Sequence, residues 1–445
     1  MAALCPGFPA GRGNRAARLT LRKSAKGNGI SSSKRSKERH SMEEKKTTYY
    51  EILVKKEWSY TTGAVVMAIL AVMLAAFAGN WGVLGPLPLW GGKLLTFLGI
   101  DADSWKMYNG SLAKYRFLNN QAAITNVALI FGAMISCLLA AQWKIRGIKS
   151  ARQVWAAIIG GILMGIGARI NPGCNIGAMF SAIPAFSLSG WVFLVCMFLG
   201  AIVGGKILAK WFLPPVSHER RAKRKNLTPE QRKQNRIIQV MVGAALIVAW
   251  IVFAFATKKT APSAGFILFT GLGIGYALQH SRFCFTAAYR DPVLTGSVKI
   301  TKALLVALAV ATIGFVGLHI SRYGVDLSKL PETAPGGAIG LHLVIGSFVF
   351  GIGAVLAGGC ACGTFVRIGE GSLQNMIALV FFIAGSMIGG PLMSAMQQSP
   401  LLYSGKGVYL PQLLGGFGPA ILLQLLALLL LWIAADRWEQ QRGKR

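Results

Sequence analysis

The stretch VIGSFVFGIGAVLAGGCACG, residues 344–363, begins as a long apolar run and ends in a cluster of glycines and cysteines. An apolar run of this kind is typical of a membrane-spanning helix. Glycine relieves backbone clashes, so GGCACG at 358–363 predicts that the helix breaks there and that the chain turns. Spanning a membrane does not require thiols, and Cys360 and Cys362 therefore indicate a function at the break.

The composition of the whole chain supports a membrane protein. Of its 445 residues, 53% are hydrophobic and only 14% are charged, whereas soluble proteins carry about 25% charged residues. We predict an all-α polytopic membrane protein with about 9–10 transmembrane helices plus short broken half-helices. The predicted spans are roughly 61–79, 120–142, 153–171, 188–212, 237–256, 264–280, 299–320, 338–358, 374–396 and 412–434.

The charge distribution predicts how the chain is oriented. The net charge is +32, from 47 Lys and Arg against 15 Asp and Glu. Basic residues concentrate in the N-terminal tail, in the hydrophilic loops at 142–152 and 218–236, and at the C-terminus, as the positive-inside rule requires of cytoplasmic segments. We therefore expect both termini in the cytoplasm and no nucleic-acid partner, with 80–119 and 321–337 facing outward.

Polarity also divides the chain into segments. Residues 1–45 are basic and poor in apolar residues, which predicts a disordered tail, and Met42 has the character of a natural start. A first transmembrane half at 55–213 is followed by a basic cytoplasmic loop at 214–236. The remaining predicted segments are a second transmembrane half at 237–435 and a basic cytoplasmic C-terminus at 436–445.

The two halves share a repeated motif. GIGARINPGCNIG at 165–177 aligns without gaps onto GIGAVLAGGCACG at 351–363, with seven identities in thirteen positions that include Cys174 and Cys360. In the predicted orientation the span before Cys174 runs outward and the span before Cys360 runs inward. This arrangement predicts two pseudo-symmetric inverted repeats, an architecture that places a transport site near the membrane midplane at broken helices.

The repeated motif also predicts an anion-binding environment around its thiols. A half-helix that starts after a break presents unpaired N–H groups, which attract anions and stabilise a thiolate. The competing explanation is that small residues only allow close helix packing. The glycines expected to shape the two breaks are Gly173, Gly177, Gly358, Gly359 and Gly363.

A third thiol lies in a different motif, GYALQHSRFCFTAAYRDP at 275–292. His280, Arg282 and Cys284 end a predicted span, where charged residues line a pathway or reach for the interface. We interpret Arg282, His280 and Cys362 as candidate helpers of an anion pathway. Arg169 is a further candidate helper, although it equally fits an interfacial position. The first half should contain an equivalent of this motif, and KYRFLNN at 114–120 is our candidate, with Leu118 in place of Cys284.

Other kinds of chemistry are not supported by the sequence. There is no phosphate-binding G-x-x-x-x-G-K-[ST] motif for ATP-driven transport within this chain. Cys360 and Cys362 have no nearby histidine or second cysteine pair, so we predict neither a metal site nor any other cofactor. We also predict no catalytic residues, and we do not expect an enzyme.

Three blocks of the chain resemble the YeeE/YedE sulfur-transport family: GIGARINPGCNIG at 165–177, SRFCFTAAYRD at 281–291 and VLAGGCACGTFVRIGEG at 355–371. The resemblance covers roughly 55–435. It implies a multi-pass protein of the bacterial inner membrane with an hourglass-like pathway. In the thiosulfate-importing branch three cysteines line the central route, and the matching residues here are Cys174, Cys284 and Cys360. The order of the two halves is more similar to the YedE branch, which is associated with selenium metabolism.

We therefore expect a transporter that imports a small sulfur- or selenium-containing compound, such as a thiosulfate-like anion or a selenium oxyanion. The expected partners are that anion, the lipid bilayer and a cytoplasmic sulfur-carrier protein. The alternative hypothesis is a membrane-embedded sulfur or selenium carrier, or a transferase, that forms a persulfide or selenosulfide on Cys360 or Cys362. A C-x-C pair favours the alternative because it supplies an attacking and a resolving thiol.

Overall fold

A computed structural model describes residues 51–212, 228–257, 263–324, 337–399, 401–403 and 407–443. The predicted tail at 1–45, with its start at Met42, lies outside the described residues, and so does 214–227 of the predicted loop. The chain divides into two units, Met1–Lys56 and Glu57–Arg445, and each is described by itself. The described part of the first unit is the π-helix η1 (Glu51–Lys55).

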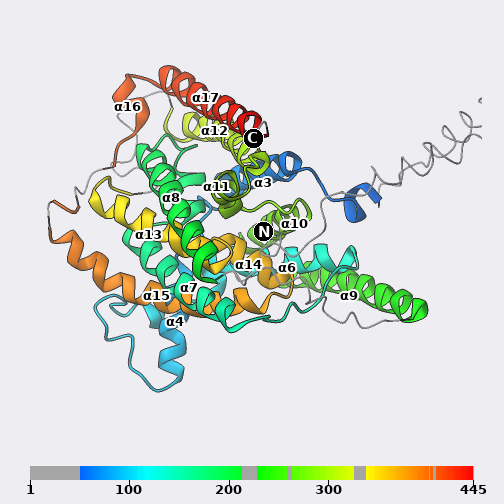
Figure 1. The fold of residues 1–445 in the computed structure, drawn as a ribbon. Coiled ribbons are helices and arrows are strands. Elements are labelled where there is room, and N and C mark those ends of the chain that lie inside the picture. Colours follow the sequence, from blue (N-terminus) through cyan, green and yellow to red (C-terminus); the bar gives the residue numbers. More distant parts are fainter. Residues whose placement is uncertain are drawn as a thin grey trace, which may run out of the picture. The chain divides into compact units, whose positions relative to one another are not determined.

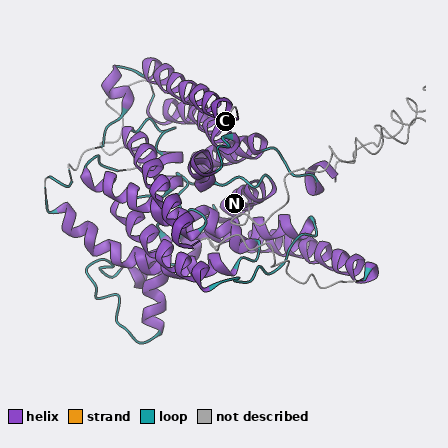
Figure 2. Ribbon diagram, in the orientation of Figure 1, coloured by secondary structure: helices purple, strands orange, loops and turns teal. Residues whose placement is uncertain are grey.

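The described residues of the second unit form helices joined by loops, without a strand (Figures 1 and 2). Nine of these helical segments are long and apolar enough to cross a membrane, which confirms the predicted all-α polytopic class. They are α3 (Tyr60–Phe77), α6 (Gln121–Leu139), α7 (Ala151–Ile170), α8 (Leu188–Ile207) with η4 (Leu208–Phe212), α9 (Pro229–Ala256), α12 (Lys299–Tyr323), α13 (Leu341–Ala357) with α14 (Ala361–Gly369), α15 (Leu373–Gln397) and α17 (Phe417–Gly443).

The remaining predicted span, 264–280, forms α10 (Ala264–His280), a helix of 17 residues that is shorter than the other nine spans. Several still shorter elements connect or interrupt the spans. They are α4 (Pro86–Phe97), α5 (Ser111–Lys114), η2 (Phe117–Asn119), η3 (Asn175–Ser181), α11 (Phe285–Leu294) and α16 (Leu410–Leu414).

Helix α9 begins inside the segment that the sequence predicts as a loop. Its first residue is Pro229, eight residues before the predicted span. The Thr228 side chain accepts a hydrogen bond from the Gln231 backbone N–H, and the Gln231 side chain accepts one from the Thr228 N–H. This capping box, with proline at the first helical position, starts the helix in polar sequence that hydropathy alone assigns to a loop.

The two halves are built from the same order of elements. In the first half the order is α3, α4, α6, α7, η3 and α8, and in the second it is α10, α11, α12, α13, α14 and α15. The packing is reciprocal, because α3 packs on α12 while α10 packs on α6, and α15 packs on α7 while α13 packs on α8. An internal repeat whose halves interlock produces this exchange of contacts.

Glycines bring the two broken helices α7 and α13 into backbone contact. A Cβ atom added to Gly167 would lie 2.5 Å from the Phe350 nitrogen, and one added to Gly353 would lie 2.8 Å from the Gly160 oxygen. Small residues permit this close approach between membrane helices. The crossing holds together the two helices that precede Cys174 and Cys360.

Candidate functional site

Each of the three predicted pathway cysteines caps a short helix. Cys174 precedes η3, Cys284 precedes α11 and Cys360 precedes α14, and all three have extended backbone conformations. A residue in this position lies beside the N–H groups of the first helical turn, which have no partner within the helix. The predicted helix breaks are therefore present, and at each of them a thiol lies at the positive end of a helix.

The breaks differ in the glycines that form them. Gly358 has a φ of +81° and ends α13 in the left-handed region, which glycine adopts without strain. Gly173 lies against the following helix, because an added Cβ would be 2.7 Å from the Ala178 Cβ. At Gly177 an added Cβ would have no neighbour within 4 Å. An added Cβ at Gly359 would be 3.4 Å from the Gly363 carbonyl carbon, which is ordinary contact.

Cys360 and Cys284 face the same point from different segments. The Cys360 sulfur accepts a hydrogen bond from the Gly363 N–H at 3.4 Å. A Cβ atom added to Gly363 would lie 3.6 Å from the Cys360 sulfur and 3.7 Å from the Cys284 sulfur. The missing side chain of Gly363 thus leaves a small space between two thiols that are 76 positions apart in the sequence.

Cys174 and Cys362 lie in the same region. The Cys360 thiol lies close enough to the Cys284 and Cys174 thiols to interact electrostatically with both. The Cys362 thiol lies close enough to interact with all three. Cys174, Cys360 and Cys362 are almost completely buried. The six described cysteines are all free thiols. The structure therefore brings the three predicted pathway cysteines and the candidate helper Cys362 together, whereas the sequence places them in three separate motifs.

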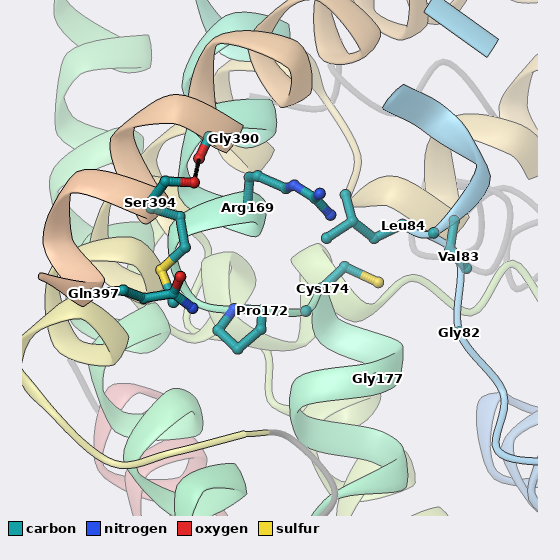
Figure 3. Close-up of a pocket in the computed structure, with 13 residues that line it drawn as sticks. Gly82, Val83, Leu84, Arg169, Pro172, Cys174, Gly177, Gly390, Ser394 and Gln397 are labelled. Atoms are coloured by element: carbon teal, nitrogen blue, oxygen red, sulfur yellow. Dashed lines mark hydrogen bonds between the residues drawn. The ribbon is translucent and has the colours of Figure 1, made fainter. Parts of the chain in front are cut away.

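Cys174 and Arg169 line a cavity of about 430 Å³ (Figure 3). Both side chains extend toward the 82–85 segment, which forms the opposite wall. Near the Cys174 sulfur are the backbone N–H groups of Gly177, Ile176 and Val83, although no directed cap hydrogen bond forms. Such a cavity, with a cation and backbone donors around a thiol, is suited to a small anion.

One wall of this cavity was not predicted. It is one face of α15, formed by four residues at helical spacing: Gly390, Met393, Ser394 and Gln397. Their i, i+3, i+4, i+7 pattern is visible in the sequence, but it marks only a shared face and not what that face contacts.

The segment equivalent to the Cys284 break was predicted incorrectly. In chain order and in packing, α3 and α4 correspond to α10 and α11, because α4 packs on α15 as α11 packs on α8. Residues 78–85, which end at the N-cap Gly85 of α4, therefore take the place of the Cys284 segment. Leu118 lies in η2 just before α6 and is not equivalent to Cys284. The hydropathy pattern did not reveal this break, because 78–85 and α4 precede a long polar stretch, and the sequence analysis assigned 80–119 as one outward-facing segment.

Arg282 and His280 lie just before Cys284 and have partners of their own. Arg282 adopts a φ of +54° and forms an ion pair with Glu57 at 2.5 Å. The His280 ring contacts the rings of Trp58 and Tyr276, with centroids 5.1 and 5.4 Å away. The His280 Nδ1 also lies at hydrogen-bond distance, 3.4 Å, from the Ser136 hydroxyl, so His280 has both ring and polar contacts within the fold, and the charge of Arg282 is paired with that of Glu57.

Several buried polar side chains in the short helices have unpaired atoms. Both polar atoms of the fully buried Asn175 amide and the hydroxyls of Thr286 and Thr364 lack a directed hydrogen bond. The Thr286 hydroxyl approaches the Cys360 sulfur, but not in the geometry of a directed bond. A buried polar group without a partner costs about 1–3 kcal/mol. These groups are therefore positioned to bind a polar ligand or water, a role that the sequence analysis missed.

The family described as Sulphur transport matches residues 24–203 and 280–445. The probable transporter YedE of Escherichia coli (strain K12) is 30% identical over 339 residues, which cover 75% of this chain and 81% of that protein. The probable transporter YedE of Salmonella typhimurium is also 30% identical, over 342 residues that cover 81% of it.

A shorter similarity extends to a protein with a named substrate. The thiosulfate transporter TsuA of Escherichia coli (strain K12) is 35% identical over 138 residues. The matched region covers 31% of this chain and 37% of TsuA.

Proposed function

This chain belongs to the Sulphur transport family, and from that premise we propose that it imports a small sulfur- or selenium-containing anion through a thiol-lined route. The relatives are named as transporters, which agrees with the prediction that the chain is not an enzyme. A thiosulfate-like anion is the first candidate substrate, because one relative is a thiosulfate transporter. A selenium oxyanion is the second, on the resemblance to the YedE branch.

The observation that carries this proposal is the convergence of Cys174, Cys284 and Cys360, each at the start of a short helix. A polarisable thiol makes favourable contact with the soft terminal sulfur of thiosulfate, whereas a hard oxyanion such as sulfate gains less. The helix N-termini stabilise the negative charge of the anion. In this mechanism the anion passes from one thiol to the next without forming a covalent bond.

The persulfide hypothesis has less support from the geometry. Cys360 caps α14 and Cys362 lies two positions further, and residues two apart on a helix do not share a face. An attacking thiol and its resolving thiol need to approach each other. A stable sulfur or selenium adduct on Cys360, detected by mass spectrometry during transport, would favour that hypothesis over the non-covalent route.

The test of the proposal is uptake of labelled thiosulfate and labelled selenite by cells that lack their own transporters. We expect Cys360→Ala to reduce uptake of the substrate by about tenfold or more, which corresponds to ~1.4 kcal/mol. Cys196→Ala, in the middle of α8 and at none of the three capped helix starts, is the matched control and should transport like the wild type. Unchanged uptake of both compounds by Cys360→Ala would exclude the thiol route.

The location and partners follow from the same proposal. We place the chain in the bacterial inner membrane with both termini in the cytoplasm, on the basic segments that flank the spans. A cytoplasmic sulfur-carrier protein is the proposed acceptor of the imported compound. Its binding to membranes that contain this chain, and not to membranes without it, would test that part.

A further inference from the structure

Two arginines lie close to the pathway thiols, and they differ in their ionic partners. Arg282, two residues before Cys284, forms an ion pair with Glu57 at 2.5 Å. Arg169 lines the cavity that contains Cys174, and within the described residues it has no ion pair and no hydrogen bond. The hydroxyl of Tyr108 is close enough to interact with it electrostatically, and this hydroxyl donates to the Pro88 carbonyl oxygen at 2.8 Å.

The internal repeat shows that this cation is specific to one half. At the constant offset of the repeat, Arg169 corresponds to Val355, which is fully buried. The equivalent position in the second half therefore has neither a charge nor exposure to a cavity. Since the surrounding glycines and the cysteine are the same in both copies, the packing of the motif does not require an arginine.

The predicted orientation places the two arginines at opposite ends of the route. Helix α7 starts after the basic 142–152 segment and therefore runs outward, so that Arg169 lies near its outer end. Glu57 precedes α3, whose start is assigned to the cytoplasm, and it holds Arg282 at that side. Among the described residues, the outer end thus keeps a cation without an ionic partner, while the cation at the inner end is paired with Glu57.

We propose that Arg169 is the loading site of the transporter, where the incoming anion is captured above Cys174, and that the Glu57–Arg282 pair keeps the inner end from holding it. This inference rests on the proposed function. An uncompensated cation in a cavity attracts an anion and raises its local concentration. A neutralised cation does not, so the anion leaves the thiols more readily at the inner end. The charge asymmetry between the two ends would then separate capture from release.

The kinetic test separates these two roles. Initial uptake of labelled thiosulfate is measured against concentration in cells. Arg169→Gln should raise KM by about tenfold and leave the maximal rate within about twofold, because a charge-assisted contact to the anion is lost. Arg169→Lys keeps the positive charge, so its KM and maximal rate should stay near those of the wild type. That result would also show that the position tolerates substitution. Arg116→Gln, which removes an exposed positive charge outside the cavity, is the matched control.

Glu57→Gln tests the inner end. It should free Arg282, lower the maximal rate by about threefold or more and leave KM unchanged or lower, because the anion is then retained at the inner end. The proposal is overturned if Arg169→Gln has the same KM as Arg116→Gln, or if Glu57→Gln changes neither parameter.

A second measurement does not depend on the substrate. On purified full-length protein, the rates at which an anionic and a cationic methanethiosulfonate reagent modify Cys174 are compared by mass spectrometry. Arg169→Gln should lower the anionic-to-cationic rate ratio by about fivefold or more, and Arg116→Gln should leave it unchanged. If wild-type cells take up no thiosulfate but the ratio depends on Arg169, the proposed substrate is wrong and the loading site stands. If uptake depends on Cys360 but neither KM nor the ratio depends on Arg169, only the loading site is rejected.

Discussion

At the scale of single residues, the position of Gly363 is as informative as that of the cysteines. Its hydrogen atom occupies the point that the Cys360 and Cys284 sulfurs both face. The sequence predicts Gly363 as a residue that shapes the break, but it does not show that the glycine leaves room between two thiols. The same limit applies to Asn175 and Thr286, whose unpaired polar atoms become visible only once burial is known.

We predict that Gly363→Ala blocks transport without destabilising the protein. The added methyl would make ordinary contacts of 3.6 and 3.7 Å with the two sulfurs, so it fills the space between them without a clash. Uptake should fall by about tenfold or more, while the thermal unfolding midpoint in detergent should stay within about 2 °C. Normal uptake by a well-folded Gly363→Ala variant would show that no anion passes between these thiols.

At the scale of elements, each break in a membrane-spanning helix at a predicted pathway cysteine is followed by a short helix that the cysteine caps. Each break ends a long helix, turns at glycine or a short loop, and starts a second helix with a cysteine at its N-cap. Irregular backbone is tolerated in a membrane only where protein or water satisfies it. The close glycine contacts between α7 and α13 supply the protein surroundings for two of these breaks.

The crossing of α7 and α13 should therefore be sensitive to one methyl group. In Gly167→Ala the new Cβ would lie 2.5 Å from the Phe350 nitrogen and 2.7 Å from the Gly346 oxygen, both of which are backbone atoms. The helices would have to separate, at a cost of about 1–3 kcal/mol. We expect a lower unfolding midpoint in detergent, measured by thermal denaturation.

Gly317→Ala in α12 is the matched control for that experiment. An added Cβ there would have no neighbour within 4 Å, so the midpoint should be unchanged or slightly higher because alanine favours the helix. If the two variants unfolded at the same temperature, the contact between α7 and α13 would not limit stability.

At the scale of the whole molecule, the ion pairs agree with the predicted orientation. Arg146, in the basic 142–152 segment, pairs with Glu370 at the end of α14, and Lys302 at the start of α12 pairs with Asp436 and Glu439 in α17. Each pair joins segments that the charge distribution assigns to the cytoplasmic side.

The orientation itself is testable in intact spheroplasts with a membrane-impermeant thiol reagent. Lys93→Cys, exposed on α4 in the segment predicted to face outward, should be labelled from outside. Lys149→Cys, exposed in the basic segment before α7, should be labelled only after the membrane is opened. Labelling in the opposite order would invert the orientation and, with it, the assignment of Arg169 to the outer end.

The sequence by itself determined the features that depend on local composition. Apolar runs defined the spans, because a chain in a bilayer must satisfy its backbone within each helix. Glycine next to cysteine in a repeated motif predicted the breaks at Cys174 and Cys360, and basic loops predicted the orientation. The sequence did not reveal the capped start of α9, because polar residues in a helix have the same hydropathy as polar residues in a loop.

The tertiary structure alone decided which of these segments meet. It placed Cys284 against Gly363 and paired Arg282 with Glu57. It also built the cavity of Arg169 and Cys174 from the 82–85 segment and one face of α15. The same packing replaced the expected segment at 114–120 by 78–85. The physical reason is that helical periodicity shows which residues share a face, but the partner of that face is fixed by close packing between segments far apart in the chain.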